Sequence, residues 1–262
     1  MGIALITGAT AGLGLEFAWQ LAAARHDLVL VARTENRLNE VAEQLRAVAG
    51  VNVEVICADL SVVEDVERVA ERLRITGDEA GETRHPVGLL VNNAGFGYAQ
   101  RFIDGDVDVE LRAFDVMARA VLILTRTAVG QMVPRGRGAI LNVGSIAALT
   151  ASGTYSAHKA WVRNFTEGLA HELAGTGVTA TAVAPGLTRT EFHSRAELNT
   201  AGLPSIGWLS AERVVSDALT AVRRGQVLCT PTKRYQLAAA ALRLAPRAVV
   251  RALGKPGLGP TN

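Results

Sequence analysis

The chain has 262 residues, 49% of them apolar, a composition typical of a globular protein and not of a disordered one. Its 27 basic and 25 acidic residues leave a net charge of +2, which removes the usual electrostatic argument for a nucleic-acid partner. Two cysteines are too few for a disulfide framework, and neither a signal peptide nor a membrane span is expected, so the sequence predicts a cytoplasmic protein.

Short apolar runs alternate with helical patterns along the chain. We expect strands at residues 3–7, 28–32, 52–57, 88–91, 139–143, 178–184 and 226–230. Several are nearly continuous in Val, Ile, Leu and Ala, which is typical of strands buried on both faces of a parallel sheet. Between them, apolar residues recur at helical spacing, as in Leu38, Val41, Ala42, Leu45 and Val48. The pattern predicts an α/β fold: a Rossmann-type, doubly wound parallel sheet with helices on both faces.

A glycine-rich turn follows the first strand and opens the first helix. It contains Gly8, Thr10, Ala11, Gly12, Leu13 and Gly14. Glycines in such a turn let backbone N–H groups approach a pyrophosphate, and the helix N-terminus adds partial positive charge. The alternative is a tight turn that simply needs small residues. The position directly after the first strand favours a dinucleotide site.

The end of the second strand distinguishes between cofactors. NAD sites tend to place an acid here, but this sequence has Val31-Ala32-Arg33-Thr34 with no acid before Glu35. The guanidinium of Arg33 suits a 2′-phosphate through bidentate hydrogen bonds, so the sequence favours NADP(H) over NAD(H). Arg37 can share this role, and a solvated arginine at the start of the next helix is the alternative.

Six motifs resemble those of the short-chain dehydrogenase/reductase family, in the family's order and over about residues 3–230. They are Thr7-Gly8-x-x-x-Gly12-x-Gly14, Asp59-Leu60, Asn92-Asn93-Ala94-Gly95, Ser145, Tyr155-x-x-x-Lys159 and Pro185-Gly186-x-x-x-Thr190. The resemblance implies that Asp59 contacts the adenine ring. It implies that Asn92, Ala94 and Gly95 line the floor under the adenosine and support the sheet, and that Thr190 holds the nicotinamide carboxamide or the phosphates. Leu60, Pro185, Gly186 and Thr188 complete the expected cofactor contacts.

The chemistry implied is hydride transfer, with Tyr155 as general acid/base. Tyr155 and Lys159 are four residues apart on a helical pattern and so share a face. We expect the ammonium of Lys159, together with an oxidised nicotinamide ring, to lower the pKa of the phenol. Ser145 would hydrogen-bond the same substrate oxygen, and Lys159 and Tyr155 would also contact the cofactor. The alternative is a helix with Tyr and Lys on a solvated face.

Two features depart from the family pattern. The family usually has an asparagine where Asp115-Val116-Met117-Ala118 places Met117, and methionine offers only a weak acceptor to a proton relay. The segment from Ser145 to Tyr155 is also short, and its Ser152 and Thr154 are alternative hydroxyl groups. A nucleotide-binding protein with little or no turnover, a sensor or scaffold, is therefore the alternative to an NADP-dependent enzyme.

The family forms a lid after Pro185-Gly186, here at about residues 187–209 of a domain that we expect to span residues 1–232. Apolar side chains in this lid favour a hydrophobic ketone or secondary alcohol, such as a 3-oxoacyl chain, although ordinary packing explains them equally: Phe192, Leu198, Leu203, Ile206 and Trp208. The scattered histidines, among them His158 and His193, predict no metal site. The family also implies a homodimer or homotetramer.

A basic tail at residues 233–262 follows this domain. No acidic residue occurs after Asp217, and Pro246 divides the tail into two short helical pieces. One interpretation is a cationic amphipathic segment that makes peripheral contact with an anionic membrane. The other is a surface or subunit-contact helix with solvated charges. In its basic tail the chain resembles a bacterial, ketoacyl-reductase-like branch of the family.

Overall fold

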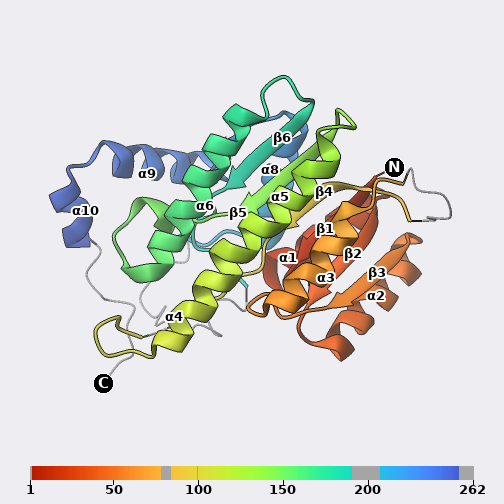
Figure 1. Cartoon of the computed structure of the whole chain (residues 1–262). Helices are drawn as coiled ribbons and strands as arrows, with labels where there is room; N and C mark the ends of the chain where they lie inside the picture. The colour runs from red at the N-terminus through yellow and green to blue at the C-terminus, as the bar shows by residue number, and fades with distance from the viewer. Residues whose placement is uncertain (1, 78–83, 99, 191–206, 254–262) are drawn as a thin grey trace.

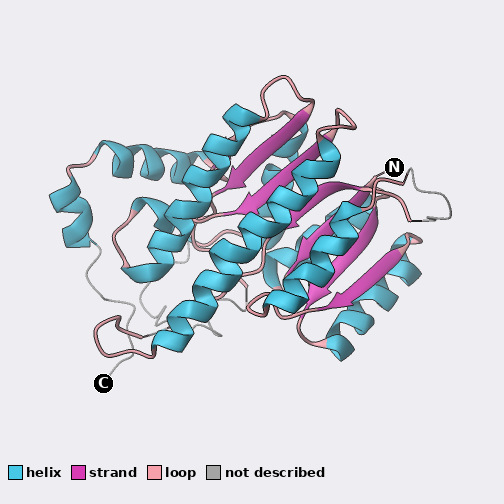
Figure 2. Ribbon diagram, in the orientation of Figure 1, coloured by secondary structure: helices cyan, strands magenta, loops and turns pink. Residues whose placement is uncertain are grey.

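A seven-stranded parallel sheet lies at the centre of the computed structural model, which describes residues 2–77, 84–98, 100–190 and 207–253 (Figures 1 and 2). Its strands are β1 (Ile3–Thr7), β2 (Asp27–Ala32), β3 (Val53–Cys57), β4 (Val87–Asn92), β5 (Gly138–Val143), β6 (Val178–Val183) and β7 (Leu228–Cys229). They lie in the order β3-β2-β1-β4-β5-β6-β7. The strand order reverses between β1 and β4, which confirms the doubly wound fold. Sheets of this kind generally bind their ligands beyond the carboxyl ends of the strands at such a reversal.

Helices cover both faces of the sheet. One face packs against α1 (Gly12–Ala23), α2 (Glu35–Ala49) and α8 (Ala211–Arg223), and the other against α3 (Val63–Arg74), α5 (Ala120–Met132) and α6 (Gly153–Glu172). Successive strand residues point to opposite faces, so Ile6 lies in the first core and Leu5 in the second. Burial on both faces explains why the strands read as continuous apolar runs.

The remaining elements surround the carboxyl ends of the strands or extend the fold beyond β7. Helix α4 (Val107–Phe114) continues through the π-helical turn η1 (Asp115–Arg119) into α5, and the 3-10 turn η2 (Ile146–Leu149) follows β5. Two helices follow β7, α9 (Lys233–Leu244) and α10 (Arg247–Leu253), and Pro246 separates them as the sequence predicts. In the described part of the chain, no helix has both the length and the apolar character needed to cross a membrane.

Two expectations about local structure are wrong in detail. Val48 is 74% exposed, because α2 ends at Ala49 and the chain turns at Gly50 so that Val51 takes the buried place. The last strand covers only Leu228–Cys229, since β6 pairs with it over two residues at the edge of the sheet.

Candidate active site

The glycine-rich turn joins β1 to α1 and packs against the loop after β4. A Cβ atom at Gly14 would lie 2.1 Å from the carbonyl oxygen of Gly8 and 2.5 Å from Nδ2 of Asn93, so only glycine fits. Nδ2 of Asn93 donates to the carbonyl oxygen of Thr7 at 2.9 Å, and the Thr7 hydroxyl accepts the backbone N–H groups of Asn93 and Ala94, each at 3.0 Å. The turn and the loop after β4 are therefore one connected unit.

Within this loop, Asn92 and Asn93 have different roles. The Asn92 side chain is 4% exposed and donates to Thr125 Oγ1 at 3.0 Å and to Asn142 Oδ1 at 2.8 Å. It ties β4 to β5 and α5, and its amide lies in the core and not at the glycine turn. The sequence predicted both sheet support and a cofactor contact for Asn92; its hydrogen bonds fit the sheet support, and the cofactor contact stays a prediction. Asn93 was not among the expected site residues, and its only signal was its place in the motif.

The residues of the turn fit a dinucleotide phosphate. Ala11 at the N-cap of α1 makes no side-chain hydrogen bond that caps the helix, and the N-terminus of α1 lies at this turn, where its partial positive charge favours a phosphate. Thr190, which comes after Pro185-Gly186, lies against this turn: a Cβ at Gly12 would be 3.3 Å from Cβ of Thr190. Partly buried Thr10 and Leu13 complete the turn. The structure thus brings the first and last motifs together.

A basic side chain stands at the end of β2. Arg33 is 70% exposed, and its Nη1 lies 4.0 Å from Oδ2 of Asp59, a distance typical of a weak surface ion pair. Oδ1 of Asp59 accepts from the backbone N–H and the hydroxyl of Ser61. Leu60 is buried in the core, so any contact of Leu60 with adenine is left to its backbone. Arg37 instead pairs with Glu40 at 2.9 Å.

Ser145, Tyr155 and Lys159 converge at the carboxyl end of β5. Lys159 is 5% exposed; its Nζ donates to the carbonyl oxygen of Val143 at 2.9 Å and lies 5.7 Å from the ring centroid of Tyr155. Ser145 hydrogen-bonds Tyr155 through its side chain, and its Oγ accepts the backbone N–H of Ala147 at 3.1 Å. The three residue types needed for proton transfer to a carbonyl oxygen are therefore adjacent.

Burial dominates the titration of this group. It raises the pKa of Tyr155 to about 12, against the downward pull of the hydrogen bond with Ser145, and it lowers the pKa of Lys159 to about 8. In this structure desolvation is the largest influence on the pKa of the phenol, and the lowering expected from Lys159 together with an oxidised nicotinamide stays a prediction. Tyr155 is accordingly protonated at neutral pH, which suits a proton donor.

Lys159→Met is expected to raise the free energy of unfolding at pH 7 by about 2 kcal/mol. A fall in the lysine pKa from 10.5 to about 8 corresponds to roughly 3 kcal/mol, and the lost hydrogen bond to Val143 offsets about 1 kcal/mol. Between about pH 8 and pH 10.5, Lys159 is protonated in the unfolded chain and deprotonated in the folded chain. The free energy of unfolding of the wild type therefore rises with pH in this range, and its difference from that of the variant becomes smaller. Urea unfolding at pH values below and above this window measures both effects, and a variant that is less stable at pH 7 would contradict the account.

Met117 lies beside Lys159, in the π-helical turn η1. It is 1% exposed, and a Cβ at Gly95 would be 3.4 Å from its Sδ and 3.5 Å from Lys159 Nζ. A π-helical turn shifts the helical hydrogen bonds by one residue and is frequent at functional sites. The side chain at the expected asparagine position is therefore next to the site but supplies no strong polar group.

A polar network joins the loop after β4 to the start of α6. The Tyr98 hydroxyl donates to Glu110 at 2.7 Å and lies 2.6 Å from Oγ1 of Thr154. Thr154 is thus engaged by Tyr98, whereas Ser145 hydrogen-bonds Tyr155. His158 points toward α4, with its ring centroid 5.9 Å from that of Phe114, and so lies on a different side of the helix from Tyr155.

The Pro185-Gly186 motif contacts the loop that follows Ser145 through its backbone. The carbonyl oxygen of Pro185 accepts the N–H of Ile146 at 2.9 Å, and the buried Thr188 hydroxyl donates to the carbonyl oxygen of Gly186 at 3.0 Å. The lid residues Phe192, His193, Leu198, Leu203 and Ile206 lie outside the described residues.

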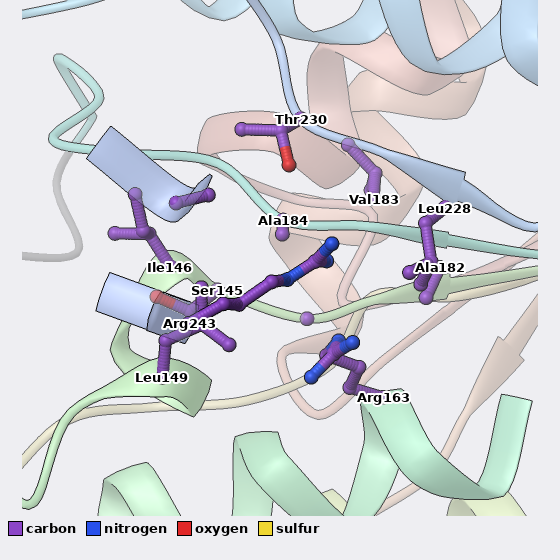
Figure 3. Close-up of a pocket in the computed structure, with 12 residues that line it drawn as sticks. Ser145, Ile146, Leu149, Arg163, Ala182, Val183, Ala184, Leu228, Thr230 and Arg243 are labelled. Atoms are coloured by element: carbon purple, nitrogen blue, oxygen red, sulfur yellow. The ribbon is translucent and has the colours of Figure 1, made fainter. Parts of the chain in front are cut away.

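A mostly apolar cavity lies behind Ser145 (Figure 3). It is bounded by η2, β6, β7 and α9, and the side chains of Arg163 and Arg243 reach into it. Neither Tyr155 nor Lys159 lines it, so we do not assign the substrate to this cavity. It does show that α9 packs directly behind the Ser145 loop.

Comparison with known proteins identifies one family. The family described as short chain dehydrogenase matches residues 2–200. Sulfoacetaldehyde reductase 2 of Chromohalobacter salexigens is 37% identical over 195 residues, which cover 72% of this chain and 74% of that protein. A short-chain dehydrogenase from Sphingobium yanoikuyae, solved with NADPH, superposes with a TM-score of 0.82 at 32% identity and 95% coverage of both chains. A bulky-bulky ketone specific alcohol dehydrogenase from Comamonas testosteroni superposes with a TM-score of 0.78 at 28% identity, and the match covers 98% of this chain and 99% of that one.

Proposed function

The chain belongs to the short-chain dehydrogenase family, and from this membership we propose that it is an NADP(H)-dependent oxidoreductase acting on a hydrophobic ketone or secondary alcohol, such as a 3-oxoacyl or other lipid-like chain. The observation that carries the proposal is the convergence of Ser145, Tyr155 and Lys159 beside Gly95, on the same sheet edge as the glycine-rich turn. Hydride transfer requires both a dinucleotide site and a proton donor there.

Each residue of this site has a separate role in the proposed ketone reduction. A bound nicotinamide supplies the hydride. Tyr155, protonated at neutral pH, donates its proton to the carbonyl oxygen of the substrate, while the Ser145 hydroxyl orients that oxygen. The ammonium of Lys159 stabilises the phenolate that remains, and in alcohol oxidation Tyr155 accepts the proton instead.

NADP(H) is favoured because Arg33 is available at the end of β2. Among the described residues, its exposed guanidinium has a 4.0 Å contact with Asp59 as the one ion pair to give up when it pairs with a 2′-phosphate. The relative from Sphingobium yanoikuyae was solved with NADPH, which supports the same preference.

Two relatives suggest different substrates. The Comamonas testosteroni enzyme is specific for bulky-bulky ketones, whereas the Chromohalobacter salexigens enzyme is named for a small anionic aldehyde. Purified protein with NADPH should therefore be assayed against a panel that contains aryl and long-chain ketones, 3-oxoacyl thioesters and sulfoacetaldehyde. Turnover of bulky ketones above that of sulfoacetaldehyde supports the proposal, and the reverse order contradicts the hydrophobic substrate class.

The alternative function is nucleotide binding without turnover, and Met117 is the observation behind it. If the wild type is an active enzyme, we expect Met117→Asn to change kcat by no more than about fivefold, because Tyr155 and Lys159 are unchanged. A Met117→Asn protein that gains activity where the wild type has none would support the sensor or scaffold instead. Steady-state kinetics of the two proteins on the same substrate distinguish these outcomes.

We also propose a homodimer or homotetramer and a peripheral membrane contact. Most of the apolar residues at 113–132 are buried within the chain, but Val107, Leu111 and Phe114 form an exposed apolar stripe on α4 that a second copy would cover. On the C-terminal helices, Leu237 is 73% exposed and Leu244 86% exposed, among basic side chains. Sedimentation equilibrium tests the first proposal and flotation with anionic vesicles tests the second.

A further inference from the structure

Helix α9 contacts both ends of the segment that follows Pro185-Gly186. We call residues 187–190 and 207–209 the two stems of this segment. The hydroxyl of Tyr235 accepts the backbone N–H of Leu187 at 3.0 Å and donates to the carbonyl oxygen of Gly207 at 2.8 Å. One side chain from beyond the last strand therefore joins the two stems.

Other contacts hold the same arrangement. The backbone N–H of Leu209 donates to the carbonyl oxygen of Leu187 at 2.8 Å, and the N–H of Arg189 donates back to Leu209 at 2.9 Å. Nη2 of Arg234, the neighbour of Tyr235, donates to the carbonyl oxygen of Trp208 at 3.2 Å. The stems thus form a short paired structure, with α9 anchored on it at two consecutive positions.

The ring of Tyr235 packs directly on Gly186. A Cβ atom at Gly186 would lie 2.0 Å from Cζ of Tyr235, far inside van der Waals contact. Gly186 has a negative φ, so its backbone conformation does not itself demand glycine. The glycine of this motif is therefore required here by the tyrosine from α9, which fixes where the first stem leaves β6.

The first stem carries residues toward the phosphate-binding turn. Thr188 is buried and its hydroxyl donates to the carbonyl oxygen of Gly186. Thr190 lies against Gly12 at the start of α1. We propose that Tyr235 is a positioning residue for the cofactor: by joining the stems it sets Thr188 and Thr190 against the nicotinamide half of NADP(H). This rests on the proposed function, and it makes α9 part of the active site's support.

The test compares two ligands that differ by the nicotinamide half. Tyr235→Phe keeps the ring on Gly186 and removes both hydroxyl hydrogen bonds, and Gln236→Ala is the matched control, because it removes only the bond from α9 to the Thr230 carbonyl oxygen. Calorimetric titration uses NADPH and 2′,5′-ADP, which contains the adenosine half alone. We expect Tyr235→Phe to raise the Kd for NADPH about tenfold and the Kd for 2′,5′-ADP less than about twofold. The control should change neither Kd.

Hydrogen exchange without nucleotide supplies an independent readout. In Tyr235→Phe the amide of Leu187 loses its acceptor, so peptides covering residues 184–190 are expected to exchange faster than in the wild type and the control. Unchanged exchange, an unchanged NADPH affinity or equal weakening of both ligands would each overturn the positioning role. A wild type that binds no nucleotide would instead refute the proposed function and the cofactor role of Tyr235 with it.

Discussion

Tyr155→Phe is expected to lower kcat for ketone reduction about 1000-fold, because it removes the hydroxyl that we propose protonates the substrate oxygen and leaves Ser145 only to orient that oxygen. The pKa of Tyr155, raised by burial to about 12, keeps this proton on the phenol throughout the neutral range. The ring and its packing remain, so we expect the Kd for NADPH to change less than about threefold. Single-turnover kinetics with saturating NADPH separate the chemical step from binding.

Tyr98→Phe is the matched comparison for this substitution. Its hydroxyl also lies near the start of α6, but its hydrogen bonds go to Thr154 and Glu110 and not to Ser145 or Lys159. We expect it to lower kcat less than about tenfold. Equal losses in the two variants, or a Tyr155→Phe enzyme within about tenfold of the wild type, would show that another group donates the proton.

Arg33→Ala is expected to raise the Kd for NADPH between about tenfold and a hundredfold and to change the Kd for NADH by less than about twofold. Bidentate, charge-assisted hydrogen bonds to a phosphate are worth about 1.5–3 kcal/mol, and about 1.4 kcal/mol is tenfold in affinity. The ion pair with Asp59 that the guanidinium gives up is long and exposed, so its loss offsets little of this gain. Fluorescence titration of each nucleotide, followed through Trp19, Trp161 and Trp208, measures both constants.

Arg37→Ala serves as the control for the loss of one positive charge in this region. Arg37 pairs with Glu40 on the first turns of α2, so it should leave the NADPH affinity within about twofold. If Arg37→Ala weakens NADPH as strongly as Arg33→Ala, the effect is general electrostatics and not a bound 2′-phosphate. An Arg33→Ala protein with unchanged preference would contradict the NADP(H) assignment.

The fold was predictable because local signals agree with the tertiary structure. Strands buried on both faces read as continuous apolar runs, and the alternation with amphipathic helices leaves few topologies. The errors lie where the chain turns or ends: Val48 sits in the last turn of α2, beyond the reach of the sheet, and β7 pairs over only two residues. The spacing of apolar residues along a helix does not show which of its turns extend beyond the hydrophobic core.

The site was predictable only where motifs mark it. Ser145, Tyr155 and Lys159 converge as their spacing and strand positions suggested. Tyr235 was missed because its role depends on the packing of its ring on Gly186. The two residues are far apart in the sequence, and no spacing rule connects them. The upward shift in the pKa of Tyr155 was not predictable, because the sequence does not show the depth of burial, which is its largest cause.

The measurement that tests the central claim most directly is NADPH oxidation by the wild type and Tyr155→Phe proteins across the carbonyl panel, with product identified as the alcohol. The account predicts that the wild type binds NADPH and forms alcohol from at least one bulky ketone in equal amounts with the NADP⁺ released, and that Tyr155→Phe binds NADPH but forms almost none. A wild type that binds NADPH tightly and converts no carbonyl or alcohol in the panel would contradict it and leave nucleotide binding without turnover.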